Sequence, residues 1–223
     1  MEADFWHQRW KNNEIGFHQK EINSHLQSFW PEIHVKPNGS VFVPLCGKSR
    51  DMLWLRGQGY HVIGVEISPL AVESFFAEND LQPEIRKFGS FEYWECDGLS
   101  ILRGDFFDLQ PADLAGVDAV FDRASLIALP PEMRRRYALH LHALLPESVE
   151  ILLVTLQYPQ DQMQGPPFAV ESQEVHDLYA KYYHIDCLFS LDVLAENHKF
   201  RERGISHMDE KVFLLRNHQK LST

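Results

Sequence analysis

The sequence of 223 residues is poor in cysteine, and its histidines lack the spacing of metal sites. The three cysteines, Cys46, Cys96 and Cys187, lie far apart without a C-x-x-C pair, which argues against a disulfide framework and favours a reducing compartment. The twelve histidines form no H-E-x-x-H or comparable pattern. We therefore expect no metal cofactor.

Long apolar runs and clusters of basic residues are also missing. No apolar stretch approaches the ~20 residues that a membrane span requires, and the opening Met-Glu-Ala-Asp lacks the regions of a signal segment. The net charge is −11 at pH 7, and we interpret the one dense basic run, residues 134–136, as a solvated helix face. Nucleic acid and membrane are not expected as partners, and we expect a cytoplasmic location.

Two apolar runs near the first third of the chain carry most of the information. Residues 40–45 form a strand that breaks at a turn around Gly47, and residues 61–67 form a second strand that contains Glu66 near its end. Residues 48–58 between them have the pattern of a crossover helix. This order opens a doubly wound α/β domain, in which the turn approaches a ligand and the acid accepts hydrogen bonds from a ribose.

The turn departs from the dinucleotide fingerprint G-x-G-x-x-G, because residues 44–46 read Pro-Leu-Cys where glycines would stand. A cofactor without phosphates suits such a turn better than a pyrophosphate. Gly47-Lys48-Ser49 looks like the end of a Walker A loop, but Phe42 occupies the place of its first glycine. A phosphate-binding loop and a plain buried strand and turn stay open as alternatives.

The remaining pattern predicts a single domain over residues 1–223, with a helical N-terminal cover (1–39), a core (40–216) and a tail (217–223). The core is predicted to be α/β, with a doubly wound, mostly parallel seven-stranded sheet and helices on both faces. An Asp-Gly pair at residues 97–98 predicts a hairpin turn, and the last two strands suit an antiparallel hairpin at the sheet edge. Other strands are expected at 91–96, 100–103, 117–122, 150–156, 184–193 and 211–216, and helices at 21–30, 68–79, 131–145 and 171–183.

Ligands of such sheets bind at the carboxyl ends of the strands. We therefore expect the turn at residues 45–47, Glu66, and the dipeptide Asp122-Arg123 to converge, with residues 104–106 nearby. Two carboxylates there can serve ribose hydroxyls and an adenine amino group. The arrangement is typical of enzymes that use S-adenosylmethionine, and the antiparallel final strand strengthens this interpretation.

Six segments follow one another in order over nearly the whole chain. They are Phe5-Trp6-His7-Gln8-Arg9-Trp10 with Gly16-Phe17-His18, Val43-Pro44-Leu45-Cys46-Gly47-Lys48, Gly64-Val65-Glu66-Ile67-Ser68, Phe121-Asp122-Arg123-Ala124, Gly165-Pro166-Pro167-Phe168 and Glu210-Lys211-Val212-Phe213-Leu214-Leu215. Together these segments resemble the thiopurine S-methyltransferase family, whose fold is the Rossmann-like class I S-adenosylmethionine-dependent methyltransferase fold. The shorter N-terminus is more similar to bacterial members.

The resemblance implies which residues contact the cofactor. Trp10 would cover it from the N-terminal extension, and Trp6 would help to close the site. Leu45 would contact it through the first turn, and Glu66 would bind the ribose hydroxyls. The dipeptide Asp105-Phe106 stands where the family contacts the adenine. From the residues alone, the two tryptophans could equally be core residues.

The resemblance also implies two residues near the acceptor. Arg123 would lie beside the methionine part of the cofactor and the acceptor, where it could orient the acceptor or stabilise a thiolate. Phe17 would line the acceptor pocket. From the residues alone, Arg123 could instead pair with Asp122 or Asp118, Phe17 could belong to the core, and residues 165–168 could be a stiff loop or a lid.

The implied function is methyl transfer from S-adenosylmethionine to the sulfur of aromatic and heterocyclic thiols such as 6-mercaptopurine, giving S-adenosylhomocysteine. Such thiols are acidic enough that a dedicated base is not required. The alternatives are a methyltransferase of selenium or tellurium compounds or another small xenobiotic, and a cofactor-binding module without catalysis. We expect a monomer.

Overall fold

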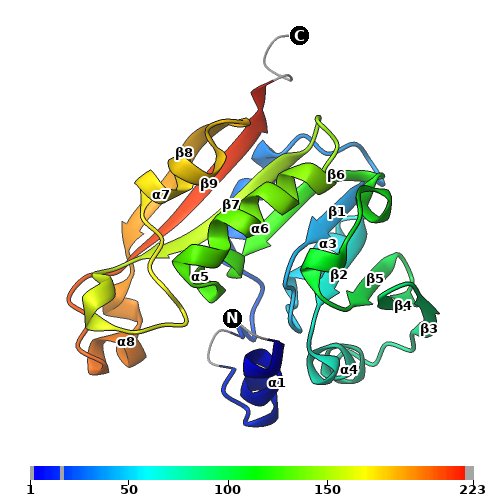
Figure 1. Ribbon diagram of the computed structural model, residues 1–223, viewed down its shortest axis with the longest axis horizontal. Helices are drawn as coiled ribbons and strands as arrows, with labels where there is room; N and C mark the ends of the chain where they lie inside the picture. Colours follow the sequence, from blue (N-terminus) through cyan, green and yellow to red (C-terminus); the bar gives the residue numbers. More distant parts are fainter. Residues whose placement is uncertain (1–2, 16–17, 219–223) are drawn as a thin grey trace.

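The computed structural model describes residues 3–15 and 18–218, and within these residues the strands pair in one continuous sheet (Figure 1). The strands are β1 (Ser40–Val43), β2 (His61–Glu66), β3 (Glu84–Phe88), β4 (Phe91–Cys96), β5 (Leu99–Arg103), β6 (Val117–Arg123), β7 (Glu150–Gln157), β8 (Tyr183–Asp192) and β9 (Asp209–Asn217). The helices are α1 (Ala3–Lys11), α2 (Ser24–Phe29), α3 (Asp51–Gly57), α4 (Pro69–Glu78), α5 (Ser125–Ala128), α6 (Pro131–Leu144), α7 (Ser172–Tyr179) and α8 (His198–Glu202).

The strand order is β3-β4-β5-β2-β1-β6-β7-β9-β8. The strands from β5 to β7 run parallel, β9 is antiparallel to β7, and β8 is antiparallel to β9. This confirms the predicted parallel centre with an antiparallel hairpin at one edge. It also places the ends of β1, β2 and β6 next to one another at the carboxyl edge of the sheet.

The predicted count of seven strands is wrong, because β3 and β4 extend the other edge to nine strands among the described residues. The β4–β5 hairpin was expected, and it turns at Asp97 and Gly98, whose φ angles of 46° and 77° suit a two-residue hairpin turn. Strand β3 gives no apolar alternation because all five of its residues are exposed. An exposed edge strand needs no buried side, so hydrophobic periodicity cannot reveal it.

Two hydrophobic clusters lie on opposite faces of the sheet, since neighbouring residues of β1 alternate between them: Phe42 belongs to one, and Val41 and Val43 belong to the other. Helices α6 and α7 cover the Phe42 face, and α2, α3 and α4 cover the opposite face (Figure 1). The chain thus has the predicted helices on both faces of the sheet, and the strands are held rigidly from both sides.

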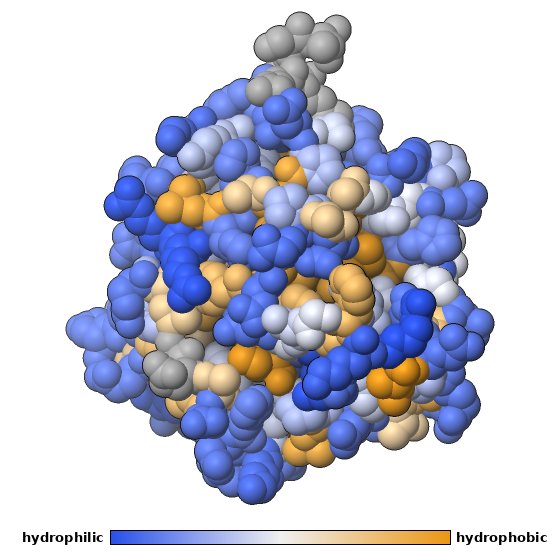
Figure 2. Space-filling model, turned by 45° about the vertical axis from the view of Figure 1, so that its right-hand side comes forward, coloured by the Kyte–Doolittle hydropathy of each residue, from blue (hydrophilic) through white to orange (hydrophobic). Residues whose placement is uncertain are grey.

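The face of the molecule in Figure 2 is mostly hydrophilic, with hydrophobic residues showing in separate patches and recesses. The predicted solvated face at residues 134–136 is only partly right: Arg135 and Arg136 are exposed, but Arg134 is fully buried. Its guanidinium donates from Nε to the carbonyl oxygens of Leu126 and Leu129, both at 3.0 Å. Among residues 3–15 and 18–218, no helix is long and apolar enough to span a membrane.

The N-terminal segment crosses the carboxyl edge of the sheet before the core begins. Helix α1 contacts α4 (Figure 1), and α2 starts at the side chain of Asn23, whose Oδ1 accepts hydrogen bonds from His25 N at 3.0 Å and Leu26 N at 3.1 Å. Helix α2 is shorter than the predicted 21–30, because Asn23 caps its start and the chain tightens into a 3₁₀ turn at Trp30. This segment supplies one wall of the site.

Candidate active site

The turn after β1 has an unusual backbone. Leu45 and Gly47 have φ angles of 46° and 54°, in the left-handed region that costs a non-glycine residue of order 1 kcal/mol or more. The Cys46 N–H donates to the Val65 carbonyl at 3.0 Å, which ties the turn to β2. A Cβ atom on Gly47 would lie 3.2 Å from the Trp10 ring, so this ring packs directly on the turn.

Glu66, at the end of β2, fixes the same turn through its carboxylate. Its Oε2 accepts a hydrogen bond from Gly47 N at 2.8 Å, and its Oε1 accepts one from Ser68 N at 2.7 Å. Burial raises the pKa of Glu66, and the backbone hydrogen bonds from Ser68 and Gly47 oppose this rise. Each oxygen keeps a second acceptor site, so the carboxylate can still receive two hydroxyl groups.

The hydrogen bond from Gly47 N to Glu66 argues against the Walker A alternative. In a phosphate-binding loop the backbone N–H groups point at the phosphate. Here the Gly47 N–H points at the carboxylate of Glu66, and Lys48 pairs with Glu78 at 2.6 Å. A phosphate at this turn would face a negative charge instead of free donors.

The first cavity lies over this turn and holds about 640 Å³ of empty space, its open mouth included. Four of the predicted residues, Trp6, Trp10, Leu45 and Glu66, line it together. The other walls are mostly apolar. They are Gly47, Ile67, Ala124, Ile127, Ala128, Pro166 and Pro167.

The segment 165–168 forms a wall of this cavity through Pro166 and Pro167. This favours a role of the segment in the site over the interpretation as a stiff loop alone. The Phe168 N–H donates to the Ile127 carbonyl at 2.7 Å, and the Tyr158 hydroxyl donates to the Pro167 carbonyl at 2.6 Å. The end of the loop is therefore held by two hydrogen bonds to the rest of the fold. Its two prolines and Ile127 together present a rigid apolar surface opposite the tryptophans of α1.

A second cavity of about 420 Å³ adjoins the first, and Trp10, Leu45, Gly47 and Ala124 line both. Arg123 lines this second cavity, together with His18 and Lys48. Burial lowers the pKa of His18, and the positive charge of Lys48 lowers it further. Arg123 and Lys48 bring two cations to the second cavity and Asp51 brings one carboxylate, so the side chains that line it carry a net positive charge.

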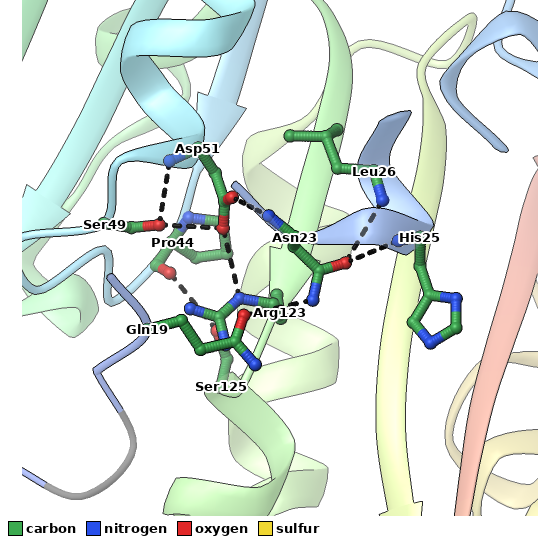
Figure 3. A network of polar contacts seen from close by, with 9 residues as sticks. All are labelled: Gln19, Asn23, His25, Leu26, Pro44, Ser49, Asp51, Arg123 and Ser125. Carbon is green, nitrogen blue, oxygen red and sulfur yellow. Dashed lines mark hydrogen bonds and ion pairs between the residues drawn. The ribbon is translucent and has the colours of Figure 1, made fainter. Parts of the chain in front are cut away.

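Arg123 pairs with neither of the acids considered from the sequence. Its Nε donates to Asp51 Oδ2 at 3.1 Å (Figure 3). Asp122 instead accepts a hydrogen bond from the Tyr137 hydroxyl at 2.7 Å, and Asp118 pairs with Lys36 at 2.9 Å. Ala124, which follows Arg123, has a φ of 71°, so β6 ends in a sharp turn at the shared wall of the two cavities.

Asp105 and Phe106, the predicted adenine contacts, line neither of these two cavities. Asp105 is exposed, and its Oδ1 accepts a hydrogen bond from Phe107 N at 2.9 Å. The Phe106 side chain is 2% exposed and packs on Tyr137 with ring centres 4.8 Å apart. A contact with the adenine through the Phe106 side chain is thus not supported, and Phe17 lies outside the described residues.

Asp51, Ile127 and Ala128 are residues of these cavities that sequence reasoning missed. The two apolar residues carry no chemical signal, since any buried helix would contain them. Asp51 stands at the start of α3 and was hidden inside a predicted helix that began three residues earlier. His18 had been noted in the motif Gly16-Phe17-His18, without a position for its side chain.

The residues of the two cavities suit S-adenosylmethionine. The buried carboxylate of Glu66 can take the two ribose hydroxyls, and the cationic second cavity can take the carboxylate of the methionine part. The apolar walls of the first cavity can exclude water from the sulfonium. Among residues 3–15 and 18–218, no group of three or more metal-binding side chains is found.

The sheet order and the cavity at its carboxyl edge define the fold of S-adenosylmethionine-dependent methyltransferases. A solved structure of such an enzyme from Anabaena variabilis superposes with a TM-score of 0.65, over 97% of this chain and 95% of that chain, at 15% identity. At that identity the likeness concerns the fold alone.

Closer relatives specify the family. The family model described as Thiopurine S-methyltransferase (TPMT) matches residues 1–218. Thiopurine S-methyltransferase from Nitrosospira multiformis is 55% identical over 96% of this chain and 98% of the relative, and that from Pseudomonas paraeruginosa is 52% identical over 96% and 99%. The chain belongs to the thiopurine S-methyltransferase family.

Proposed function

We propose that this chain transfers a methyl group from S-adenosylmethionine to the sulfur of small aromatic and heterocyclic thiols, thiopurines included. The observation that carries the proposal is the position of Glu66 under an apolar cavity, held by two backbone N–H groups and adjoined by a cationic cavity. The family of the chain supports the acceptor class.

The cofactor supplies a methyl group that is already activated by the sulfonium. The protein therefore has to hold donor and acceptor in line and to exclude water. In this proposal Glu66 binds the ribose, and Arg123 binds the carboxylate of the methionine part. Trp6 and Trp10 cover the site, and Leu45 supports the cofactor through its turn.

The acceptor fits between the tryptophans of α1 and the wall formed by Ile127, Pro166 and Pro167. These surfaces are apolar and fixed, so they suit a flat ring better than a flexible polar chain. A heterocyclic thiol ionises near neutral pH, so the site needs no strong base. The cations of the second cavity would favour the anionic form electrostatically.

The proposal is tested by transfer of labelled methyl from S-adenosylmethionine to 6-mercaptopurine with purified protein. Labelled S-methyl product supports the donor, the reaction and the acceptor class together. If S-adenosylhomocysteine binds but no product forms, the acceptor class is wrong, and selenium and tellurium compounds are tested next. If neither product nor binding is found, the cofactor assignment fails as well.

The sequence-based expectations of a monomer, of a cytoplasmic location and of no nucleic-acid or membrane partner stay predictions. A single domain over residues 1–223 is likewise a prediction, which the continuous sheet supports.

A further inference from the structure

A buried acid, Asp51, joins three segments that are far apart in the sequence. Its side chain is 2% exposed and accepts hydrogen bonds on both oxygens (Figure 3). Oδ1 accepts from Asn23 N at 2.8 Å, and Oδ2 accepts from the Ser49 hydroxyl at 2.8 Å and from Arg123 Nε at 3.1 Å. The N-terminal cover, the turn after β1 and the end of β6 thus meet at one carboxylate.

These contacts limit how Asp51 can hold Arg123. An arginine and a carboxylate often form two parallel hydrogen bonds. Here Oδ1 accepts from Asn23 N, and the contact with Arg123 joins only Nε and Oδ2. Within residues 3–15 and 18–218, the two terminal nitrogens of Arg123 have no hydrogen bond or ion pair, while the residue lines the second cavity.

A guanidinium held at Nε keeps a planar pair of donors on its far edge. This pair matches the geometry of a free carboxylate. Lys48, which also pairs with Glu78, lines the second cavity beside Arg123. Asp51 lines it too, but hydrogen bonds from Asn23, Ser49 and Arg123 occupy its two oxygens. The same two cations and Arg50 all act on His18, where burial and these charges lower the pKa of the imidazole.

We propose that Asp51 is a positioning residue, which holds Arg123 at Nε so that the terminal nitrogens receive the carboxylate of the methionine part of the cofactor. This inference rests on the proposed function, because it needs the cofactor in these cavities. Asp51 lines the second cavity as well, but its two oxygens are occupied within the protein, so in this proposal it acts through Arg123. Through Asn23 it also ties the start of α2 to the orientation of Arg123.

The test compares two ligands that differ in the group that Arg123 would bind. S-adenosylhomocysteine has the amino-acid carboxylate, and 5′-methylthioadenosine lacks it while keeping the adenosine and the sulfur. Calorimetry gives the Kd of both for the unchanged protein and for Asp51→Asn. We expect Asp51→Asn to weaken S-adenosylhomocysteine about 10-fold and 5′-methylthioadenosine less than 2-fold, since a charge-assisted hydrogen bond is lost only for the first.

Asp118→Asn is the matched control. Asp118 also accepts from a backbone N–H, that of Ser40 at 2.9 Å, and pairs with a cation, Lys36. It lines none of the cavities described above, so Asp118→Asn should leave both Kd values within 2-fold. Equal weakening of both ligands by Asp51→Asn, or no weakening of either, would overturn the proposal.

A double-mutant cycle gives a second readout that a purely structural role would not produce. In the Arg123→Ala background, Asp51→Asn should weaken S-adenosylhomocysteine less than 2-fold further, because its effect passes through Arg123. A full 10-fold effect in that background would contradict the inference. If Asp51→Asn does not fold, Ser49→Ala replaces it, with about 3-fold weakening confined to S-adenosylhomocysteine as the expected result. If neither ligand binds the unchanged protein, the proposed function itself fails.

Discussion

The two charged residues at the cavities, Glu66 and Arg123, are held in place by different means. Glu66 is fixed by main-chain donors, Gly47 N and Ser68 N, at 2.8 Å and 2.7 Å. Arg123 is fixed by a side chain, Asp51, which is in turn held by Asn23 and Ser49. A main-chain support survives most substitutions around it, whereas a side-chain support can be removed by one. Substitutions around Glu66 and around Arg123 should therefore have different effects on ligand binding.

A substitution of Glu66 itself should have the largest effect on ligand binding, because its side chain is the proposed contact with the ribose. In Glu66→Gln, one ribose hydroxyl loses its acceptor, and the other meets a neutral amide oxygen in place of a carboxylate. With ~2 kcal/mol for each of these two ribose contacts, we expect roughly 1,000-fold weaker binding of S-adenosylhomocysteine by calorimetry.

Glu150→Gln serves as the control for Glu66→Gln. Glu150 is also a buried glutamate that accepts a backbone hydrogen bond, from His34 N at 2.9 Å, but it lies at the opposite end of the sheet. It should bind the ligand normally if it folds. A loss below 10-fold in Glu66→Gln would mean that the ribose is not bound there.

The acid beside Arg123 allows a comparison of two buried carboxylates. Asp51 has a cation as partner, whereas Asp122 has the Tyr137 hydroxyl. Burial raises the pKa of Asp122 to about 6 from its ordinary value of 3.8, despite the hydrogen bond from Tyr137. The native state therefore binds this proton more tightly than the unfolded chain does. The contribution of Asp122 to stability falls as the pH rises from about 4 to 6 and is level above that window.

Asp122→Asn should remove this dependence. Relative to the unchanged protein, the variant should gain up to ~3 kcal/mol of unfolding free energy between pH 4 and pH 7, since each pKa unit corresponds to 1.36 kcal/mol. Urea unfolding at both pH values measures the gain. A difference between the two proteins that is the same at pH 4 and pH 7 would show that the pKa of Asp122 is not raised in the native state.

Arg123→Lys tests the support of Arg123 by Asp51, and its expected effect on ligand affinity is smaller. Lysine keeps the charge but loses both the Nε donor to Asp51 and the planar pair of terminal donors. We expect about 10-fold weaker S-adenosylhomocysteine and little change for 5′-methylthioadenosine, a loss of ~1.4 kcal/mol. Arg216→Lys is the control, because Arg216 pairs with Asp186 at 2.8 Å away from both cavities. Unchanged binding in Arg123→Lys would show that charge alone suffices.

The same contrast explains what could be predicted from the sequence. The position of Glu66 followed from an apolar strand that ends in an acid, and the main-chain contacts come with that geometry. The pairing of Arg123 with Asp51 spans 72 residues. It depends on where α3 starts, and α3 starts at Asp51, whose N–H donates to the Ser49 hydroxyl at 3.2 Å.

Other differences from the sequence-based expectations share one physical cause, namely that side-chain direction is set by tertiary packing. Arg134 has the sequence context of an exposed helix residue, yet it turns inward to two carbonyl groups and to Glu174 at 2.6 Å. Phe106 follows a strand end, where a ligand contact is expected, but a 3₁₀ turn directs its ring into the core. Strand β3 has no buried face at all.

The smallest predicted effect concerns the support of Glu66 itself. Gly47→Ala keeps the N–H that Glu66 accepts, but it forces an alanine to a φ of 54° and puts a Cβ 3.2 Å from the Trp10 ring. We expect a loss of about 1 kcal/mol in unfolding free energy and about 5-fold weaker S-adenosylhomocysteine, as Trp10 shifts. Gly57→Ala is the control, since nothing lies within 4 Å of a Cβ there and alanine favours its helix. If Gly47→Ala weakens the binding of S-adenosylhomocysteine as much as Glu66→Gln does, the main-chain support of Glu66 is not robust. The proposed difference between the supports of Glu66 and Arg123 is then wrong.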